Sequence, residues 1–182
     1  GCAGFAEALC RTIRNVPKKC LVPGKKERFL AVIGSIHPMA SRQVIYAMGA
    51  GFQRLELTQE QLAEGYWEAG EGQRLLETWR EKWHTGRKWI LDAGGVFAEG
   101  DIQEYVAKTG IPKEAVRHRI ADCLGTVACA LMEDADQAAL LATGGDTLAG
   151  VMRKLKVQEL KPRGELLQEV VYSEFTWKGR AS

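Results

Sequence analysis

Apolar residues fall in short runs that alternate with longer stretches in which they recur at helical spacing. Short apolar runs bounded by glycine or polar residues are typical of strands buried in a parallel sheet. Such runs predict strands at 29–33, 88–91 and 138–142, and alternation of apolar and polar residues predicts a half-buried strand at 52–57. Two further strand-like stretches follow at 157–160 and 169–175.

The stretches between these runs place their apolar residues on one side of a helix. They predict helices at 5–13, 38–48, 58–63, 71–83, 102–106 and 112–132, and one more that reaches Leu155. In the helix at 38–48, Val44, Ile45 and Met48 are expected to form the buried face. In the helix at 71–83, Trp79 and Trp83 lie at helical spacing and are interpreted as core residues rather than as a stacking platform for bases.

Strands that alternate with helices predict an α/β layered domain, with a mainly parallel or a mixed sheet and helices on both of its faces. A chain of 182 residues with 46% hydrophobic content can bury one sizeable core. We therefore expect a single domain over residues 1–182.

Three predicted strands end in turns of small residues, at Gly34-Ser35, Gly94-Gly95 and Gly144-Gly145. The carboxyl ends of parallel strands line one edge of a sheet, where ligands bind in α/β proteins. At Gly144-Gly145 a helix follows, and Asp146 or Thr147 can cap its first turn. Glycine backbone amides at the positive end of a helix favour an anion, most often a phosphate. The alternative is a tight turn in which glycine only solves a geometric problem.

Charge and composition exclude several classes of protein. The net charge of +2 predicts no nucleic-acid partner, because a basic stripe would be expected for one. No apolar run approaches the ~20 residues of a membrane span, so no membrane partner is expected. The five cysteines are odd in number and lack metal-type spacing, which predicts a reduced, cytoplasmic protein without disulfides or a zinc site.

Few residues stand out as catalytic or metal-binding candidates. No P-loop, dinucleotide-binding glycine motif or nucleophile elbow occurs. His37, in a strand-to-helix loop, could donate to a phosphate or form a bond within the loop. Asp92 and Asp146 adjoin glycine turns and are candidates for holding magnesium, although a capping role is the simpler account of Asp146. The sequence assigns no catalytic residue and no dedicated metal ligands.

Three stretches together resemble the C-terminal nucleotide-binding domain of the four-carbon acid sugar kinase family. The family's Gly-Ser-Ala-Gly-Leu-Ala segment resembles the opening Gly1-Cys2-Ala3-Gly4-Phe5-Ala6, although Cys2 replaces a serine there. Its Gly-Ser-x-Ser/His block resembles Gly34-Ser35-Ile36-His37, followed by Ser41 and Gln43. Its Thr-Gly-Gly-Glu/Asp-Thr block resembles Thr143-Gly144-Gly145-Asp146-Thr147. The family's later Lys-Ser-Gly-x-Phe-Gly block has no counterpart before Ser182.

The resemblance implies ATP-dependent phosphorylation of the terminal hydroxyl of a four-carbon sugar acid such as a threonate, erythronate or oxo-tetronate. It implies ATP and magnesium as cofactors, and an N-terminal substrate-binding domain outside this chain that supplies the sugar acid and the catalytic base. We therefore expect the chain to be part of a longer kinase, which could form a homo-oligomer, and to be inactive alone. The nucleotide-contacting positions that carry over are Ser35, Gly144, Gly145, Asp146 and Thr147.

Two other functional classes stay open from the sequence. A non-catalytic nucleotide-sensing module could use the same loop. An oxidoreductase with an atypical dinucleotide site would bind NAD in preference to ADP, although the absent glycine motif counts against it.

Overall fold

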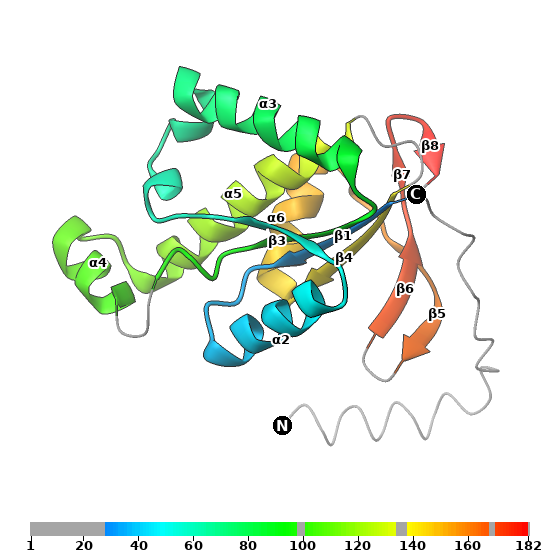
Figure 1. The fold of residues 1–182 in the computed structure, drawn as a ribbon, viewed down its shortest axis with the longest axis horizontal. Helices are drawn as coiled ribbons and strands as arrows, with labels where there is room; N and C mark the ends of the chain where they lie inside the picture. Colours follow the sequence, from blue (N-terminus) through cyan, green and yellow to red (C-terminus); the bar gives the residue numbers. More distant parts are fainter. Residues whose placement is uncertain (1–27, 98–100, 134–137, 168–169, 182) are drawn as a thin grey trace. The chain divides into compact units, whose positions relative to one another are not determined.

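A computed structural model of the chain describes residues 28–97, 101–133, 138–167 and 170–181. Four parallel strands form its central sheet in the order β2-β3-β1-β4 (Figure 1). Their bounds are β1 Arg28–Ile33, β2 Gln53–Glu56, β3 Lys88–Asp92 and β4 Ala138–Thr143. The predicted strands at 29–33, 52–57, 88–91 and 138–142 are therefore confirmed, with small changes at their ends.

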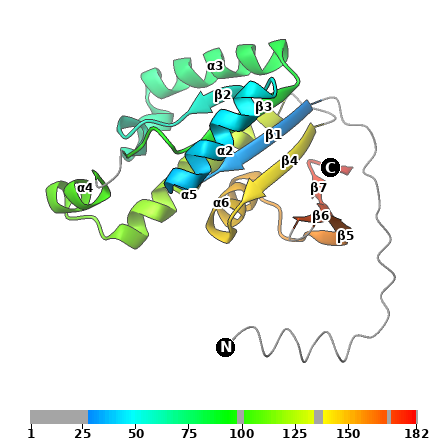
Figure 2. The same cartoon turned by 60° about the horizontal axis from the view of Figure 1, so that its bottom comes forward.

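Helices cover both faces of this sheet, with α2 in front of it and α5 behind it in Figure 2. Alternate residues of β1 explain the two layers. Ala31 and Ile33 pack with Ala40 and Val44 of α2 in one buried cluster. Leu30 points to the opposite face, where it is fully buried. The predicted class, an α/β fold with a mainly parallel sheet flanked by helices, is confirmed. The long helices are α2 Pro38–Gly49, α3 Gly70–Thr85, α4 Asp101–Thr109, α5 Lys113–Met132 and α6 Gly145–Leu155.

The chain divides into two compact units. The larger one spans 25–159 and 175–182 and contains the four-stranded sheet and all five long helices. It also contains two short 3-10 helices, η1 Glu60–Leu62 and η2 Tyr66–Glu68, and the pair β7 Thr176–Trp177 and β8 Arg180–Ala181. The second unit contains an antiparallel hairpin of β5 Lys161–Leu167 and β6 Val170–Glu174. The expectation of a single domain over 1–182 stays a prediction.

Several predicted elements differ from the structure. Residues 157–160 form no strand, whereas β5 follows directly after them; β6 confirms the strand predicted at 169–175. The helix at 58–63 is reduced to η1, whose N-cap is Gln59 without a side-chain cap bond. The helix predicted at 5–13 lies outside the described residues.

Two predictions about helix α2 and one about α6 need correction at the level of side chains. Ile45 and Met48 are exposed, by 67% and 44%, and only Val44 of the expected trio is buried. Neither Asp146 nor Thr147 caps α6, because the N-cap is Gly144 and no side-chain cap bond forms.

The tryptophans confirm their interpretation as core residues. Trp79 and Trp83 of α3 are buried, and Trp83 packs against Trp89 of β3 with ring centroids 6.4 Å apart.

The two described cysteines, Cys123 and Cys129, are free thiols in α5. Cys123 is buried, and burial raises the pKa of its thiol, so it acts as a small core residue.

Helices α5 and α6 pack very closely through small residues. A Cβ atom at Gly150 would lie 2.4 Å from the carbonyl oxygen of Ala121, and one at Gly125 would lie 2.6 Å from the carbonyl oxygen of Gly150. Only glycine allows the two backbones to approach to this distance. The close approach fixes the first turn of α6 beside the first half of α5.

Within the described ranges, no helix has the length and apolar character needed to cross a bilayer.

Candidate functional site

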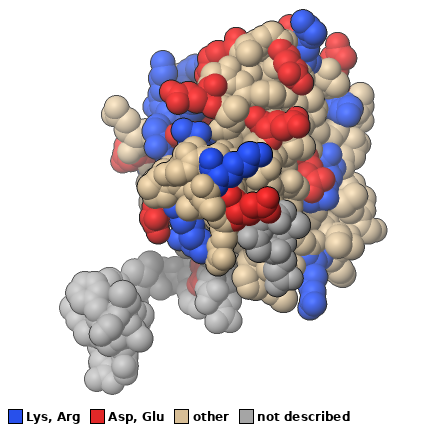
Figure 3. Space-filling model, turned by 90° about the vertical axis from the view of Figure 1, so that its left-hand side faces the viewer, with Lys and Arg blue, Asp and Glu red and all other residues tan. Residues whose placement is uncertain are grey.

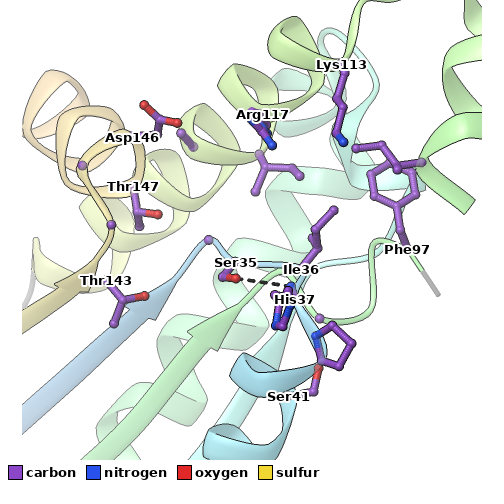
Figure 4. A pocket seen from close by; sticks show the side chains of 18 residues that line it. Ser35, Ile36, His37, Ser41, Phe97, Lys113, Arg117, Thr143, Asp146 and Thr147 are labelled. Carbon is purple, nitrogen blue, oxygen red and sulfur yellow. Dashed lines mark hydrogen bonds between the residues drawn. The ribbon is translucent and has the colours of Figure 1, made fainter. Parts of the chain in front are cut away.

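A cavity of about 680 Å³ lies at the carboxyl edge of the sheet. The loops that follow β1, β3 and β4 line it together with the amino-terminal half of α5, as Figure 4 shows. All five residues predicted to contact a nucleotide lie on its wall, although they come from two loops far apart in the sequence: Ser35, Gly144, Gly145, Asp146 and Thr147. Their role in binding a nucleotide stays a prediction.

The loop between β1 and α2 is held by two local hydrogen bonds. The amide of His37 donates to Ser35 Oγ at 3.2 Å, and the amide of Met39 donates to His37 Nδ1 at 3.2 Å. His37 is thus the N-cap of α2, and Pro38 occupies the first turn, where it needs no amide donor. Two roles were considered for His37, donation to a phosphate and a hydrogen bond within the loop. In the structure its Nδ1 accepts a hydrogen bond within the loop.

The loop between β4 and α6 leaves a helix terminus open to the cavity. Gly144 has φ = +89°, a conformation that favours glycine. Because Gly144 is the N-cap and carries no side chain, no side chain caps the first turn of α6. A Cβ atom on the next residue, Gly145, would meet no other atom within 4 Å. The amides at the start of a helix lack intrahelical partners, so this turn presents donors and a positive dipole end to the cavity.

The ends of β1 and β4 meet beneath this turn. Thr147 is buried, and a Cβ atom at Gly34 would lie 2.3 Å from Thr147 Oγ1. Glycine at position 34 therefore allows the Ser35 loop and the first turn of α6 to form one continuous wall.

Lys113 and Arg117 of α5 also line the cavity, and the sequence analysis did not find them. Both side chains point into the cavity in Figure 4. Neither forms an ion pair or a hydrogen bond with another described residue. The sequence did contain an indication of them. Positive side chains near the start of a helix oppose the helix dipole, so their presence there suggests that they serve an anionic ligand.

Asp92, one of the two magnesium candidates, is fully engaged elsewhere. It is buried at the end of β3, and its carboxylate accepts two bonds from Arg54, Nε to Oδ2 at 2.7 Å and Nη2 to Oδ1 at 2.8 Å. The amide of Gly94 donates to Oδ1 at 2.7 Å. The bond to Asp92 raises the pKa of Arg54, so the guanidinium is charged at any physiological pH. Asp92 does not line the cavity; it supports the turn at Gly94, which does.

Two further features concern the charge of the surface and the side chains that could bind a metal. On the face drawn in Figure 3, acidic and basic side chains are interspersed, without a basic stripe. The described residues contain no group of three or more His, Cys, Asp or Glu side chains that could hold a metal ion.

Comparison with known proteins identifies the family of the chain. The family described as nucleotide-binding C-terminal domain matches residues 30–180. No curated protein matches the chain significantly.

Two crystal structures of a domain of unknown function (DUF1537) from Bordetella bronchiseptica, each with bound citrate and described as a domain-swapped dimer, have a similar fold. One has a TM-score of 0.63 at 21% identity over 83% of this chain, and the other a TM-score of 0.57 at 23% identity over 82%. This chain spans about a third of their length, 34% and 32%. The family match covers the sheet, the glycine turns and the cavity. The chain therefore belongs to the family of nucleotide-binding C-terminal domains, the domain that the resemblance to four-carbon acid sugar kinases predicts.

Proposed function

We propose that the cavity binds ATP together with magnesium, and that the domain serves a kinase that phosphorylates the terminal hydroxyl of a four-carbon sugar acid. The observation that carries the proposal is the uncapped first turn of α6. It opens into a cavity of about 680 Å³ beside a glycine pair. Phosphate groups bind at such helix termini because amide donors and the dipole both favour negative charge.

The residues of the cavity suit phosphoryl transfer, which needs mainly positioning and charge stabilisation. The backbone of Gly144 and Gly145 can approach a phosphate closely, since no side chain stands between it and the cavity. Ser35 Oγ lies on the facing loop and can donate from its hydroxyl while it accepts the amide of His37.

Magnesium fits this arrangement through a single protein carboxylate. Asp146 is exposed on the cavity wall and forms no ion pair with another described residue. Protein sites for magnesium with nucleotides often use one or two carboxylates together with phosphate oxygens. We therefore assign Asp146 as the residue that would hold the ion, which would neutralise phosphate charge.

The sugar acid and the base for its hydroxyl are proposed to come from a separate substrate-binding domain of a longer protein. The solved relatives, of which this chain covers about a third, support that part of the proposal. Their description as domain-swapped dimers supports a homo-oligomer, and we propose that the assembly works in the cytoplasm.

Gly145→Val is expected to weaken binding of Mg-ATP by about tenfold to a hundredfold, the loss of one or more hydrogen bonds to a charged group. The valine side chain would fill the space through which a phosphate approaches, yet a Cβ atom there meets nothing in the protein. Isothermal titration calorimetry measures the affinity. Gly49→Val is the matched control, since a Cβ atom at Gly49 also meets nothing and Gly49 lies outside the cavity. Unchanged affinity in Gly145→Val would refute the assignment of this turn.

A further inference from the structure

Two cations stand on the cavity wall formed by α5. Lys113 and Arg117 are one helical turn apart, so they lie on the same side of the helix. Both are exposed, and in Figure 4 Arg117 lies toward Asp146 whereas Lys113 lies toward Phe97. Together they follow the length of the cavity from the first turn of α6 to its apolar end.

The packing of α5 on α6 fixes the position of Arg117. Ala121 and Gly125 of α5 both contact Gly150 of α6, and Gly125 also lies near Lys154. The two helices therefore run in the same direction along this contact. One turn back on each helix are Arg117 and Asp146, so Arg117 stands beside the uncapped first turn of α6.

The stability of the fold does not account for these cations. Other arginines of α5 and α6 are paired, since Arg153 lies 3.4 Å from Asp122 and Arg119 lies 3.9 Å from Glu64. Lys113 and Arg117 have no such partner among the described residues. Lys113 is moreover the first residue of α5, where the helix dipole disfavours positive charge. An anionic ligand would offset both costs.

We propose that Lys113 and Arg117 bind the phosphate chain of the nucleotide, and that they make the site select nucleoside di- and triphosphates over monophosphates. This inference rests on the proposed function. The first turn of α6 supplies donors for one phosphate. Each additional phosphate adds charge, which Lys113 and Arg117, the lysine and arginine among the described residues of the cavity wall, would neutralise beside the magnesium ion.

The test measures binding to the full chain with three probes: Mg-ADP, AMP, and inorganic tripolyphosphate with magnesium. Lys113→Gln and Arg117→Gln are each expected to weaken Mg-ADP and tripolyphosphate by about tenfold to a hundredfold, and AMP by much less. The remaining binding should depend less on salt, because screened charge pairs have been removed. Arg42→Gln is the matched control, as Arg42 is an exposed arginine of α2 outside the cavity.

Thermal unfolding separates a binding role from a structural one. Lys113 opposes the dipole at the start of α5, and neither cation forms an ion pair with another described residue. Both glutamine variants are therefore expected to keep or raise the melting temperature while they lose affinity. A structural role would lower it.

Each outcome decides between the two proposals. If the unmodified chain binds Mg-ADP and both glutamine variants bind it equally well, the inference about Lys113 and Arg117 is wrong and the proposed function stands. If tripolyphosphate binds and the variants lose it while Mg-ADP does not bind, the anion-binding wall is supported and the proposed function fails. If neither Mg-ADP nor tripolyphosphate binds the unmodified chain, both proposals are overturned.

Discussion

Replacing Arg54 with methionine is expected to lower the free energy of unfolding by about 3–5 kcal/mol, the cost of removing one partner of a buried ion pair. The side chain of Asp92 is only 2% exposed, and that of Arg54 is 24% exposed. Among the described residues, Arg54→Met would leave the carboxylate with the amide of Gly94 as its one remaining donor. Since proteins of this size are stable by about 5–15 kcal/mol, this loss would be a large share of the total. Urea unfolding followed by tryptophan fluorescence measures the loss.

Glu56→Gln provides the control for Arg54→Met. Glu56 Oε1 lies 2.6 Å from the same guanidinium, but its side chain is 40% exposed, so the change should cost no more than about 1 kcal/mol. Adding Asp92→Asn to Arg54→Met should restore part of the loss, because the buried charge is then gone. If Arg54→Met cost no more than Glu56→Gln, the pair would not have the structural role described above.

Gly150→Ala is expected to destabilise the protein by about 1–3 kcal/mol through overpacking. The added methyl group would lie 2.4 Å from the carbonyl oxygen of Ala121, a backbone atom that cannot move without shifting α5. Separating α5 from α6 would also draw the first turn of α6 away from Arg117, so weaker nucleotide binding should accompany the loss.

Gly49→Ala is the matched substitution for Gly150→Ala, because the same methyl group at Gly49 meets no atom within 4 Å. That variant should be as stable as the unmodified protein or slightly more stable, since alanine restricts the unfolded chain. Melting temperatures of the two variants, measured side by side, make the comparison. A Gly150→Ala protein as stable as Gly49→Ala would contradict the close packing of the two helices.

The strands of the sheet were predictable because strands buried between helix layers are apolar on both sides. The runs at 29–33, 88–91 and 138–142 carry this signal plainly. Strand β5 was missed because its sequence, Lys161-Pro162-Arg163-Gly164, contains charged residues, proline and glycine, and lies in a two-stranded hairpin. Edge pairing in a hairpin places few demands on sequence.

Periodicity predicted the helices but not the neighbours that cover each side of them. In α2 the helical spacing of Val44, Ile45 and Met48 is compatible with one buried stripe, yet the sheet covers only the side that carries Ala40 and Val44. Which side is covered depends on the packing partner, and this information is not contained in the helix itself.

The glycine turns of the candidate site were predictable, whereas its cations were not. Gly144 and Gly145 follow a strand directly, so their position at the sheet edge follows from the strand. Lys113 and Arg117 lie at the start of α5, far in the sequence from Gly144 and Gly145. The contact between α5 and α6 brings them to the cavity. The ion pair of Arg54 with Asp92 was not predictable for the same reason. Its two residues are far apart in the sequence, and the pairing of β2 with β3 brings them together.

Isothermal titration calorimetry of the unmodified chain with Mg-ADP, and with NAD as the comparison ligand, tests the central claim most directly. The account predicts that Mg-ADP binds more tightly than NAD, because the uncapped turn of α6, Arg117 and Lys113 suit a terminal phosphate chain. Equal or tighter binding of NAD would contradict a kinase-type nucleotide site at this edge of the sheet.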